Sequence, residues 1–114
     1  MSGKTARRKG HNFEREVAIL MREFFPDAIR NLEYQEGEGV DIANTGEFSI
    51  QCKVGKSFRI EKALAEAVKE NKKSVAITKK DRQKIVVSMY WDDFKELLNI
   101  YLKGSNKWTK FICS

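Results

Sequence analysis

An alternation of apolar and polar residues from Val40 to Val54 constrains the fold more than any other feature of this sequence. The apolar side chains occupy even-numbered positions: Val40, Ile42, Phe48, Ile50, Cys52 and Val54. The polar side chains occupy odd-numbered positions: Asp41, Glu47, Ser49, Gln51 and Lys53. Because successive side chains of a strand point to opposite faces of a sheet, this pattern predicts two strands, each with one apolar face.

The segment Asn44-Thr45-Gly46 has the composition of a turn between these two strands. A three-residue loop with its glycine in the left-handed conformation places Asp41 opposite Ser49. Both apolar rows then share one face, and Asp41 becomes the diagonal neighbour of Gln51 on the other face. A two-residue loop would instead place Asp41 opposite Ile50 and mix the two faces. We therefore expect the three-residue register.

Helical spacing of apolar residues occurs on both sides of this hairpin. A first helix is predicted by Phe13, Val17, Leu20, Met21 and Phe24, with Asn12 as its cap and Pro26 just beyond its end. We expect a second helix from residue 60 to about residue 71, strands over 74–78 and 85–90, and a third helix capped by Asp92. The order α-β-β-α-β-β-α, with room for an extra strand, predicts an α/β fold with a mixed central sheet flanked by helices.

The chain is strongly basic. Its 114 residues include 22 Lys and Arg against 16 Asp and Glu, a formal net charge of +6, which favours a polyanionic partner. Four cations stand near the N-terminus: Lys4, Arg7, Arg8 and Lys9. We expect residues 1–10 to form a flexible basic arm, residues 11–102 a single domain, and residues 103–114 a basic tail that carries Trp108 and Phe111.

Composition also excludes several classes of protein. The longest apolar runs are far shorter than the ~20 residues that span a bilayer, and no secretory signal is visible, so we expect an intracellular protein without a membrane partner. Cys52 and Cys113 form no disulfide or metal-ligand pattern, and Cys52 lies in the apolar row, where we expect it in the core.

The polar face of the hairpin gathers groups that suit metal-dependent chemistry. Asp41, Gln51 and Lys53 share this face, and Glu14 lies on the flank of the first helix. Carboxylate and amide oxygens are hard ligands suited to Mg²⁺. A metal held there can stabilise charge on a phosphoryl oxygen, and an adjacent lysine can orient the attacking water. The pattern therefore favours phosphodiester hydrolysis, while a polar sheet surface with an incidental lysine is the structural alternative.

Three segments carry a more specific signal: Lys9-Gly10-x-x-x-Glu14-Arg15-Glu16, Gly39-Val40-Asp41-Ile42 and Ile50-Gln51-Cys52-Lys53-Val54. Together they resemble the motifs of archaeal-type Holliday junction resolvases, which belong to the PD-(D/E)xK nuclease superfamily and have small relatives in phages. The motifs cover roughly residues 7–56, and the order of elements continues the resemblance to about residue 100. The resemblance implies a restriction-endonuclease-like core and a homodimeric DNA endonuclease acting in recombination on junction DNA.

The resemblance also implies roles for individual residues. Glu14, Asp41, Gln51 and the backbone carbonyl of Cys52 would bind Mg²⁺, for which Mn²⁺ would substitute, and Lys53 would be the catalytic lysine. We expect DNA contacts from seven cationic residues: Lys4, Arg7, Arg8, Lys9, Arg15, Arg30 and Lys56.

The sequence departs from the family pattern at two positions. Gln51 stands where the family has an acid, and Val40 stands where it has a proline. Glutamine keeps a carbonyl oxygen but lacks the charge, so metal affinity should fall. A catalytically inactive nucleic-acid-binding protein on the same fold is therefore the alternative. An RNA-binding protein of the translation apparatus is a third interpretation, but it does not explain Glu14, Asp41 and Lys53.

Overall fold

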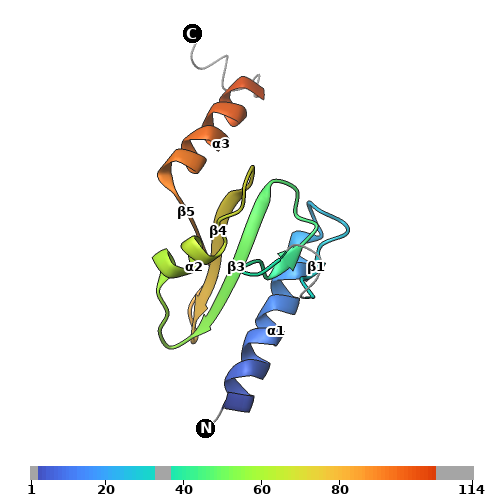
Figure 1. The fold of residues 1–114 in the computed structure, drawn as a ribbon, viewed down its shortest axis with the longest axis vertical. Helices are drawn as coiled ribbons and strands as arrows, with labels where there is room; N and C mark the ends of the chain where they lie inside the picture. The colour runs from blue at the N-terminus through green and yellow to red at the C-terminus, as the bar shows by residue number, and fades with distance from the viewer. Residues whose placement is uncertain (1–2, 33–36, 105–114) are drawn as a thin grey trace.

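The computed structural model describes residues 3–32 and 37–104 (Figure 1). The elements are α1 (Gly3–Met21), β1 (Ile29–Arg30), β2 (Ile42–Ala43), β3 (Phe48–Gly55), α2 (Ile60–Glu66), β4 (Lys73–Lys80), β5 (Val86–Met89) and α3 (Trp91–Gly104). The predicted order of elements is confirmed, with β1 as the extra strand. The chain is an α/β protein.

The five strands form one mixed sheet in the order β1-β2-β3-β4-β5. All neighbouring strands are antiparallel except β3 and β4, which are parallel. A parallel pair needs a crossover connection, and α2 provides it. The predicted mixed sheet is thus confirmed.

The apolar row of the hairpin faces α1, as the alternation predicts. Phe13 and Val17 of α1 pack against Ile42, Ile50 and Cys52 in the main core. Cys52 is 7% exposed, which confirms its predicted place in the core. Because α1 covers the even-numbered face of β3, the odd-numbered face lies on the opposite side of the sheet.

The odd-numbered face is covered as well, by α2. Ser49 is fully buried, and its hydroxyl donates a hydrogen bond to the carbonyl of Ala67, just beyond α2. The hydroxyl of Ser74 in β4 donates to the carbonyl of Leu64 in the same way. The sequence suggested a half-exposed polar surface, but here the polar side chains bond the backbone of α2. The central strands β3 and β4 are therefore covered on both faces.

The register of the hairpin differs from the prediction by two residues. Ile42 pairs with Ile50, so Asp41 lies opposite Gln51 and not opposite Ser49. The loop is longer than expected because Thr45 bonds Phe48 through both its backbone carbonyl and its hydroxyl, at 3.1 and 2.9 Å. A shift of two residues preserves the face of every side chain, and for this reason the predicted faces are right although the predicted partners are wrong.

Helix α1 begins much earlier than the sequence suggested. The expectation of a flexible arm over residues 1–10 is wrong for residues 3–10, which form the first turns of α1. Asn12 therefore lies within the helix and is not its cap, and its side-chain oxygen accepts a hydrogen bond from Arg15 at 3.0 Å. The apolar face is also shifted, because Ala18 is buried while Leu20 is 52% exposed.

Two further boundaries differ. Helix α2 ends at Glu66 and not near Asn71, which adopts a positive φ of 63°. Asp92 lies in the first turn of α3 and does not precede the helix. The predicted tail falls partly outside the described residues: Lys103 belongs to α3, whereas Trp108 and Phe111 lie beyond residue 104.

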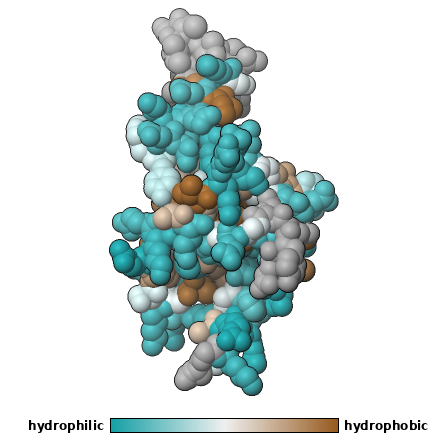
Figure 2. All heavy atoms as spheres, in the orientation of Figure 1, coloured by the Kyte–Doolittle hydropathy of each residue, from teal (hydrophilic) through white to brown (hydrophobic). Residues whose placement is uncertain are grey.

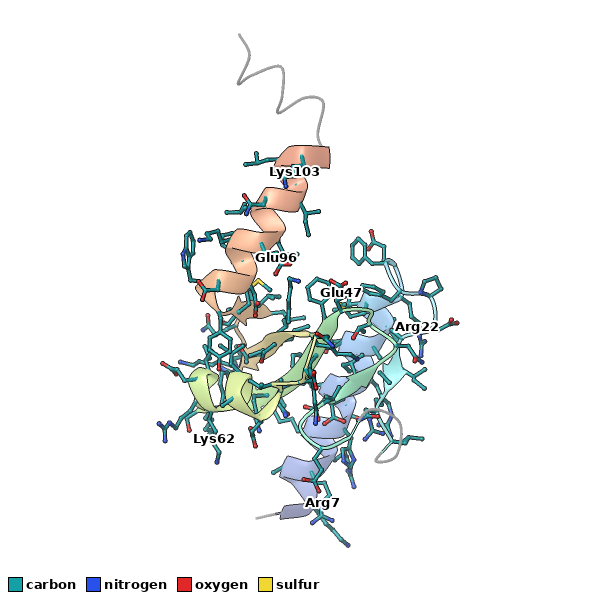
Figure 3. The ribbon with its side chains drawn as sticks, turned by 45° about the horizontal axis from the view of Figure 1, so that its top comes forward. Arg7, Arg22, Glu47, Lys62, Glu96 and Lys103 are labelled. Atoms are coloured by element: carbon teal, nitrogen blue, oxygen red, sulfur yellow. The ribbon has the colours of Figure 1, made fainter. Side chains whose placement is uncertain are left out.

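Helix α3 extends away from the sheet. The molecule measures 60 × 31 × 25 Å, and α3 projects at the end opposite the N-terminus of α1 (Figure 1). None of its residues, all of which the structure describes, is buried. Its link to the sheet includes Lys73 of β4, whose ammonium lies 3.2 Å from Glu96 of α3 and 3.7 Å from Glu47. Figure 3 shows Glu47 and Glu96 on this side of the molecule.

Within residues 3–32 and 37–104, no helix is long and apolar enough to cross a membrane.

Candidate active site

Asp41 immediately precedes β2, and its carboxylate is fixed by the backbone of β3. One carboxylate oxygen, Oδ2, accepts a hydrogen bond from the N–H of Cys52 at 2.7 Å. The Asp41 N–H donates to the carbonyl of Ile50 at 2.7 Å, and its carbonyl accepts from Asn31 at 2.8 Å. Three backbone contacts therefore define where this acid lies.

Gln51 lies opposite Asp41 on the covered face of the sheet and is 6% exposed. Its amide nitrogen donates to the carbonyl of Gly39 at 2.9 Å, which leaves the amide oxygen outside that bond. An amide oxygen is a hard donor that can bind a divalent cation. The structure thus places Gln51 beside Asp41, more directly than the predicted diagonal.

Gly39 locks the loop before Asp41 onto α2. Its φ is +82°, and a Cβ at this position would lie 1.8 Å from the backbone oxygen of Glu66. Only glycine fits, because both the conformation and the space exclude a side chain. The loop, β3 and the end of α2 are consequently held in one arrangement around Asp41 and Gln51.

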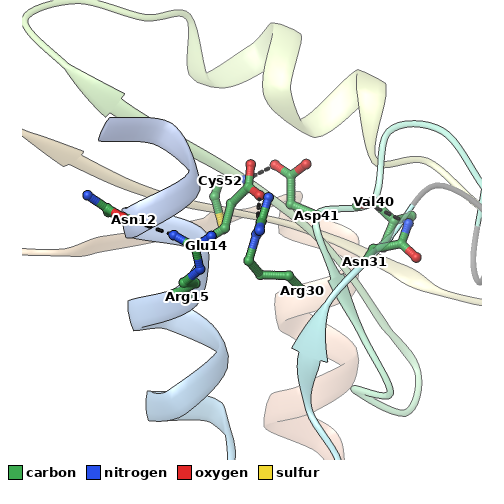
Figure 4. Close-up of polar contacts among 8 residues, drawn as sticks. All are labelled: Asn12, Glu14, Arg15, Arg30, Asn31, Val40, Asp41 and Cys52. Carbon is green, nitrogen blue, oxygen red and sulfur yellow. Dashed lines mark hydrogen bonds and ion pairs between the residues drawn. The ribbon is translucent and has the colours of Figure 1, made fainter. Parts of the chain in front are cut away.

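Glu14 reaches the same place from α1. Figure 4 shows its carboxylate pointing toward that of Asp41, beside the backbone of Cys52. Oε1 of Glu14 accepts a hydrogen bond from Nε of Arg30 in β1 at 3.1 Å, and both side chains are about four-fifths buried, with 20% and 22% of their surfaces exposed. The contact assigns Arg30 to holding Glu14, whereas the sequence suggested a contact with DNA.

Lys53 follows Gln51 along the same face of β3. Its ammonium lies 3.3 Å from Oε1 of Glu66, the last residue of α2. Sequence analysis missed Glu66, since nothing in the local pattern of α2 distinguishes it from other solvated acids. Only the parallel crossover, which returns the end of α2 to the hairpin, brings this carboxylate to Lys53.

The environment of Asp41 disfavours its charge. The pKa of its carboxyl group is raised to about 6, chiefly by burial and to a lesser extent by the charges of Glu14 and Glu66. The hydrogen bond from Cys52 and the charge of Lys53 act in the opposite direction. The net effect is a carboxyl group that ionises near pH 6, chiefly because it is partly buried.

These oxygen donors fit a magnesium ion. Within the described ranges, no three His, Cys, Asp or Glu side chains form a ready-made metal cluster. Mg²⁺, however, retains several waters and is commonly bound through one or two carboxylates, which Asp41 and Glu14 supply, with the amide oxygen of Gln51 beside them. The Cys52 thiol is no ligand of this kind, because burial raises its pKa and keeps it protonated.

The cationic residues predicted to contact DNA divide into two groups. Lys4, Arg7 and Arg8 are exposed on the first turns of α1, at the end of the molecule where Figure 3 labels Arg7. Lys9 instead forms an ion pair with Asp81, in the turn after β4. Cations at a helix N-terminus oppose the helix dipole, so this cluster costs helix stability unless an anion offsets it.

Arg15 and Lys56 are also exposed, and Lys56 follows the end of β3. Arg15 borders an open groove of about 400 Å³ between α1 and the segment around β1. The groove is lined by Arg15, Ala18, Ile19, Arg22, Ile29, Arg30 and Leu32. Arg22 was not among the predicted residues; its Nε donates to the carbonyl of Ala28 at 2.8 Å. The surface that lines the groove is mainly apolar, although three arginines border it.

Comparison of the chain with protein-family models, curated proteins and solved structures found no match. The function is therefore inferred from the geometry of these residues.

Proposed function

We propose that the chain is a Mg²⁺-dependent DNA endonuclease that acts on branched DNA. The observation that carries the proposal is the meeting of Glu14, Asp41, Gln51 and Lys53, contributed by α1, the start of β2 and β3. Two carboxylates, an amide oxygen and a lysine are the groups that metal-dependent phosphodiester hydrolysis requires.

Each residue has a distinct part in this proposal. Asp41 and Glu14 would hold the cation, with Gln51 as a neutral oxygen donor. When bound, Mg²⁺ lowers the pKa of a coordinated water and stabilises charge on a phosphoryl oxygen. The Lys53 ammonium orients the attacking water and offsets negative charge that develops on the phosphate.

Two neighbours position these groups. Arg30 holds the Glu14 carboxylate through its bond of 3.1 Å, and Glu66 lies 3.3 Å from the ammonium of Lys53. Both act through another residue and are positioning residues. These two ion pairs must weaken when the cation and DNA bind, or Glu14 and Lys53 must contact both partners at once. The reason is that each ion pair occupies one atom of a side chain assigned to the chemistry.

The distribution of cations supports DNA as the substrate. The exposed cations at the start of α1, together with Arg15 and Lys56, suit a polyanionic backbone, and phosphate contacts of this kind position a duplex without reading its sequence. Preference for branched DNA would then rest on shape. A two-fold homodimer would match the symmetry of a four-way junction.

A non-catalytic nucleic-acid-binding protein is the second candidate. It is favoured by Gln51, which contributes no charge, so that Asp41 and Glu14 would supply the carboxylates for the cation. The ion pairs of Glu14 with Arg30 and of Lys53 with Glu66 are also what a purely structural arrangement would contain. Such a protein would bind DNA equally well with and without Mg²⁺.

The test is cleavage of end-labelled four-way junction, nicked duplex, linear duplex and single-stranded DNA, with Mg²⁺, Mn²⁺ or EDTA. Lys53→Ala should reduce cleavage by at least about 100-fold while DNA affinity stays within a few-fold. Lys62→Ala, which removes an exposed lysine of α2 outside the site, is the matched control and should cleave as the wild type does.

Paired symmetric cuts in the junction that depend on metal and on Lys53 would support the full proposal. Cutting of the other substrates only would retain the nuclease and reject the junction. DNA binding without cleavage in either metal would reject the nuclease and favour the non-catalytic candidate.

A further inference from the structure

The positive charge of the chain is concentrated at one end of the molecule. The start of α1, the residue after β3 and the segment from the end of β4 toward β5 together carry nine cations: Lys4, Arg7, Arg8, Lys9, Lys56, Lys79, Lys80, Arg82 and Lys84. Asp81 is the one acid among residues 4–9, 56 and 79–84, so this end holds more positive charge than the net +6 of the whole chain. We term it the cationic end.

Backbone and side-chain contacts join the three segments of the cationic end. The N–H of Asp81 donates to the carbonyl of Gly55, the last residue of β3, at 3.1 Å, and the N–H of Gln83 donates to the carbonyl of Lys80 at 2.9 Å. The Asp81 carboxylate forms an ion pair with Lys9 of α1. Figure 1 shows the ends of β3 and β4 at the same end of the molecule as the start of α1. The cations therefore belong to one surface.

The cations of this surface are close enough to act on the same carboxylate. The pKa of Asp81 is lowered, first by the hydrogen bond from Lys9 and then by the charges of Lys9, Lys56 and Lys79. One carboxylate cannot neutralise nine cations, so the cationic end keeps a large positive charge. A surface of this kind attracts an external polyanion.

The turn between β4 and β5 presents its cations to solvent. Lys80, Arg82 and Lys84 are exposed, and on the face drawn in Figure 2 the lower end of the molecule shows mostly hydrophilic side chains. Arg82 has a φ of 63°, a conformation that glycine or asparagine adopts more readily. The geometry of the turn therefore does not account for an arginine at this position.

Lys80 connects the cationic end to the candidate active site. Thr78 pairs with Lys53 in the parallel register of β3 and β4, and Lys80 lies two residues further along β4. Side chains two residues apart in a strand point to the same face, so Lys80 and Lys53 share one face of the sheet. The strand spacing and the rise per residue place their Cα atoms about 8 Å apart. A polyanion bound at the cationic end would therefore pass beside Lys53.

The composition of the cationic end favours a nucleic-acid duplex. Lysine and arginine contact phosphates without reading the base sequence. Residues 4–9, 56 and 79–84 include no aromatic residue, whereas proteins that bind single strands commonly stack the bases on aromatic side chains. The surface thus suits a double helix, whose phosphates lie on the outside.

We propose that the cationic end binds the backbone of a duplex arm of the DNA, and that the turn between β4 and β5 contacts its phosphates together with the start of α1. The sequence resemblance does not include the four cations of this segment: Lys79, Lys80, Arg82 and Lys84. The inference rests on DNA as the partner in the proposed function, but it does not rest on cleavage.

The test is the salt dependence of DNA binding, measured by the fluorescence anisotropy of a labelled linear duplex in EDTA from about 50 to 200 mM KCl. Each phosphate contact contributes about 0.9 to the slope of log affinity against log salt concentration. Lys80→Gln/Arg82→Asn should therefore reduce the slope by about 2 and weaken binding about 30-fold at about 150 mM KCl. Asparagine replaces Arg82 because it readily adopts a positive φ.

The matched control removes two exposed lysines of α3, at the opposite end of the molecule. Lys95→Gln/Lys103→Gln makes the same change in net charge and should leave the slope unchanged and the affinity within about 2-fold. Asp81→Asn should act in the opposite direction: it releases Lys9 for a further phosphate contact and should strengthen binding about 5-fold. Circular dichroism should be the same for every variant, and a misfolded protein would not bind more tightly.

A slope that Lys80→Gln/Arg82→Asn does not change, or that both double variants change equally, would overturn the assignment of the turn. Tighter binding of single-stranded than of duplex DNA would overturn the assignment of a duplex. Duplex binding with the expected slopes but without cleavage in Mg²⁺ or Mn²⁺ would support this inference and reject the nuclease. Cleavage by a protein whose turn does not affect the slope would reject this inference and leave the nuclease intact.

Discussion

The candidate active site and helix α3 depart in opposite ways from the usual distribution of polar and apolar groups. Around Asp41, acidic groups lie in a partly buried place, and burial raises the pKa of Asp41 to about 6. On α3, large apolar side chains such as Trp91 and Phe94 are 65% and 44% exposed. One region holds a carboxyl group that has lost much of its solvation, and the other holds apolar side chains in contact with solvent.

The comparison distinguishes two kinds of missing partner. The lost solvation of the Asp41 carboxylate can be offset by a single small cation. Exposed apolar side chains are instead stabilised by contact with other apolar groups. The kind of group that is left unsatisfied therefore indicates the kind of ligand that would stabilise it.

The largest expected effect comes from a substitution in the candidate active site. Asp41→Asn should reduce metal-dependent cleavage at least about 1,000-fold, because it removes a charged ligand of the cation. The same change should raise the free energy of unfolding at pH 8 by about 1–2 kcal/mol, because it removes a desolvated charge while keeping an oxygen that can accept from Cys52. Cleavage assays and urea denaturation in EDTA measure the two effects.

Circular dichroism provides the control for this prediction. Asp41→Asn should keep the helix and strand content of the wild type. An Asp41→Asn protein that is less stable than the wild type would contradict the conclusion that its charge is unfavourable in the folded protein.

The next effect concerns the rigidity of the site. Gly39→Ala should lower the free energy of unfolding by at least about 3 kcal/mol, because its Cβ would meet the backbone oxygen of Glu66 and alanine disfavours a positive φ. Gly10→Ala is the matched control, since Gly10 lies within α1 with nothing near its Cβ position, and this change should stabilise by up to about 1 kcal/mol. Equal effects of the two changes would show that Gly39 is not tightly packed.

The pH dependence of stability follows from the raised pKa of Asp41. Its carboxyl group binds a proton more tightly in the folded than in the unfolded chain, so its contribution to stability is greatest below about pH 4. That contribution is lost as the pH rises through about 6. After allowance for the partial exposure of Asp41, we expect the free energy of unfolding of the wild type to fall over this pH range by about 2 kcal/mol relative to that of Asp41→Asn.

Mg²⁺ should restore the free energy of unfolding only at pH values at which Asp41 is ionised. Thermal denaturation in EDTA and in Mg²⁺ at pH 5 and at pH 7.5 measures the effect without any reference to cleavage. Stabilisation by Mg²⁺ that is equal at both pH values, or equal in Asp41→Asn, would place the cation elsewhere.

The smallest expected effect concerns Gln51. Gln51→Glu should lower the Mg²⁺ concentration needed for half-maximal cleavage by about 10-fold, because it adds a carboxylate beside Asp41. It should also destabilise the metal-free protein, since the new acid can no longer donate to Gly39. A clear loss of cleavage in saturating Mg²⁺ would show that the site is built around the neutral amide.

The strands and their faces could be predicted because a period of two is a local property of the sequence. Asp41, Gln51 and Lys53 stay on the same face of the sheet under any shift of register by an even number of residues. The register itself could not be predicted, because it depends on the bonds that Thr45 makes inside the loop. Likewise, the start of α1 was obscured by Gly10 and by basic residues with no apolar period.

The candidate site was predictable to a different degree. Glu14, Asp41, Gln51 and Lys53 were identified from spacing and resemblance, and the structure brings them together. Glu66 and the role of Arg30 beside Glu14 could not be identified, because both depend on contacts between segments far apart in sequence. The exposure of α3 was equally hidden, since an apolar stripe indicates only that something covers it.

The division of the site between α1 and the rest of the chain has a consequence for the order of events during folding. Asp41, Gln51 and Lys53 belong to a hairpin whose contacts are local, so they assemble early and quickly. Glu14 joins them only when α1 docks across the sheet and Arg30 pairs with it. A partly folded chain in which α1 has not docked thus holds Lys53 and one acid of the candidate site but lacks the second.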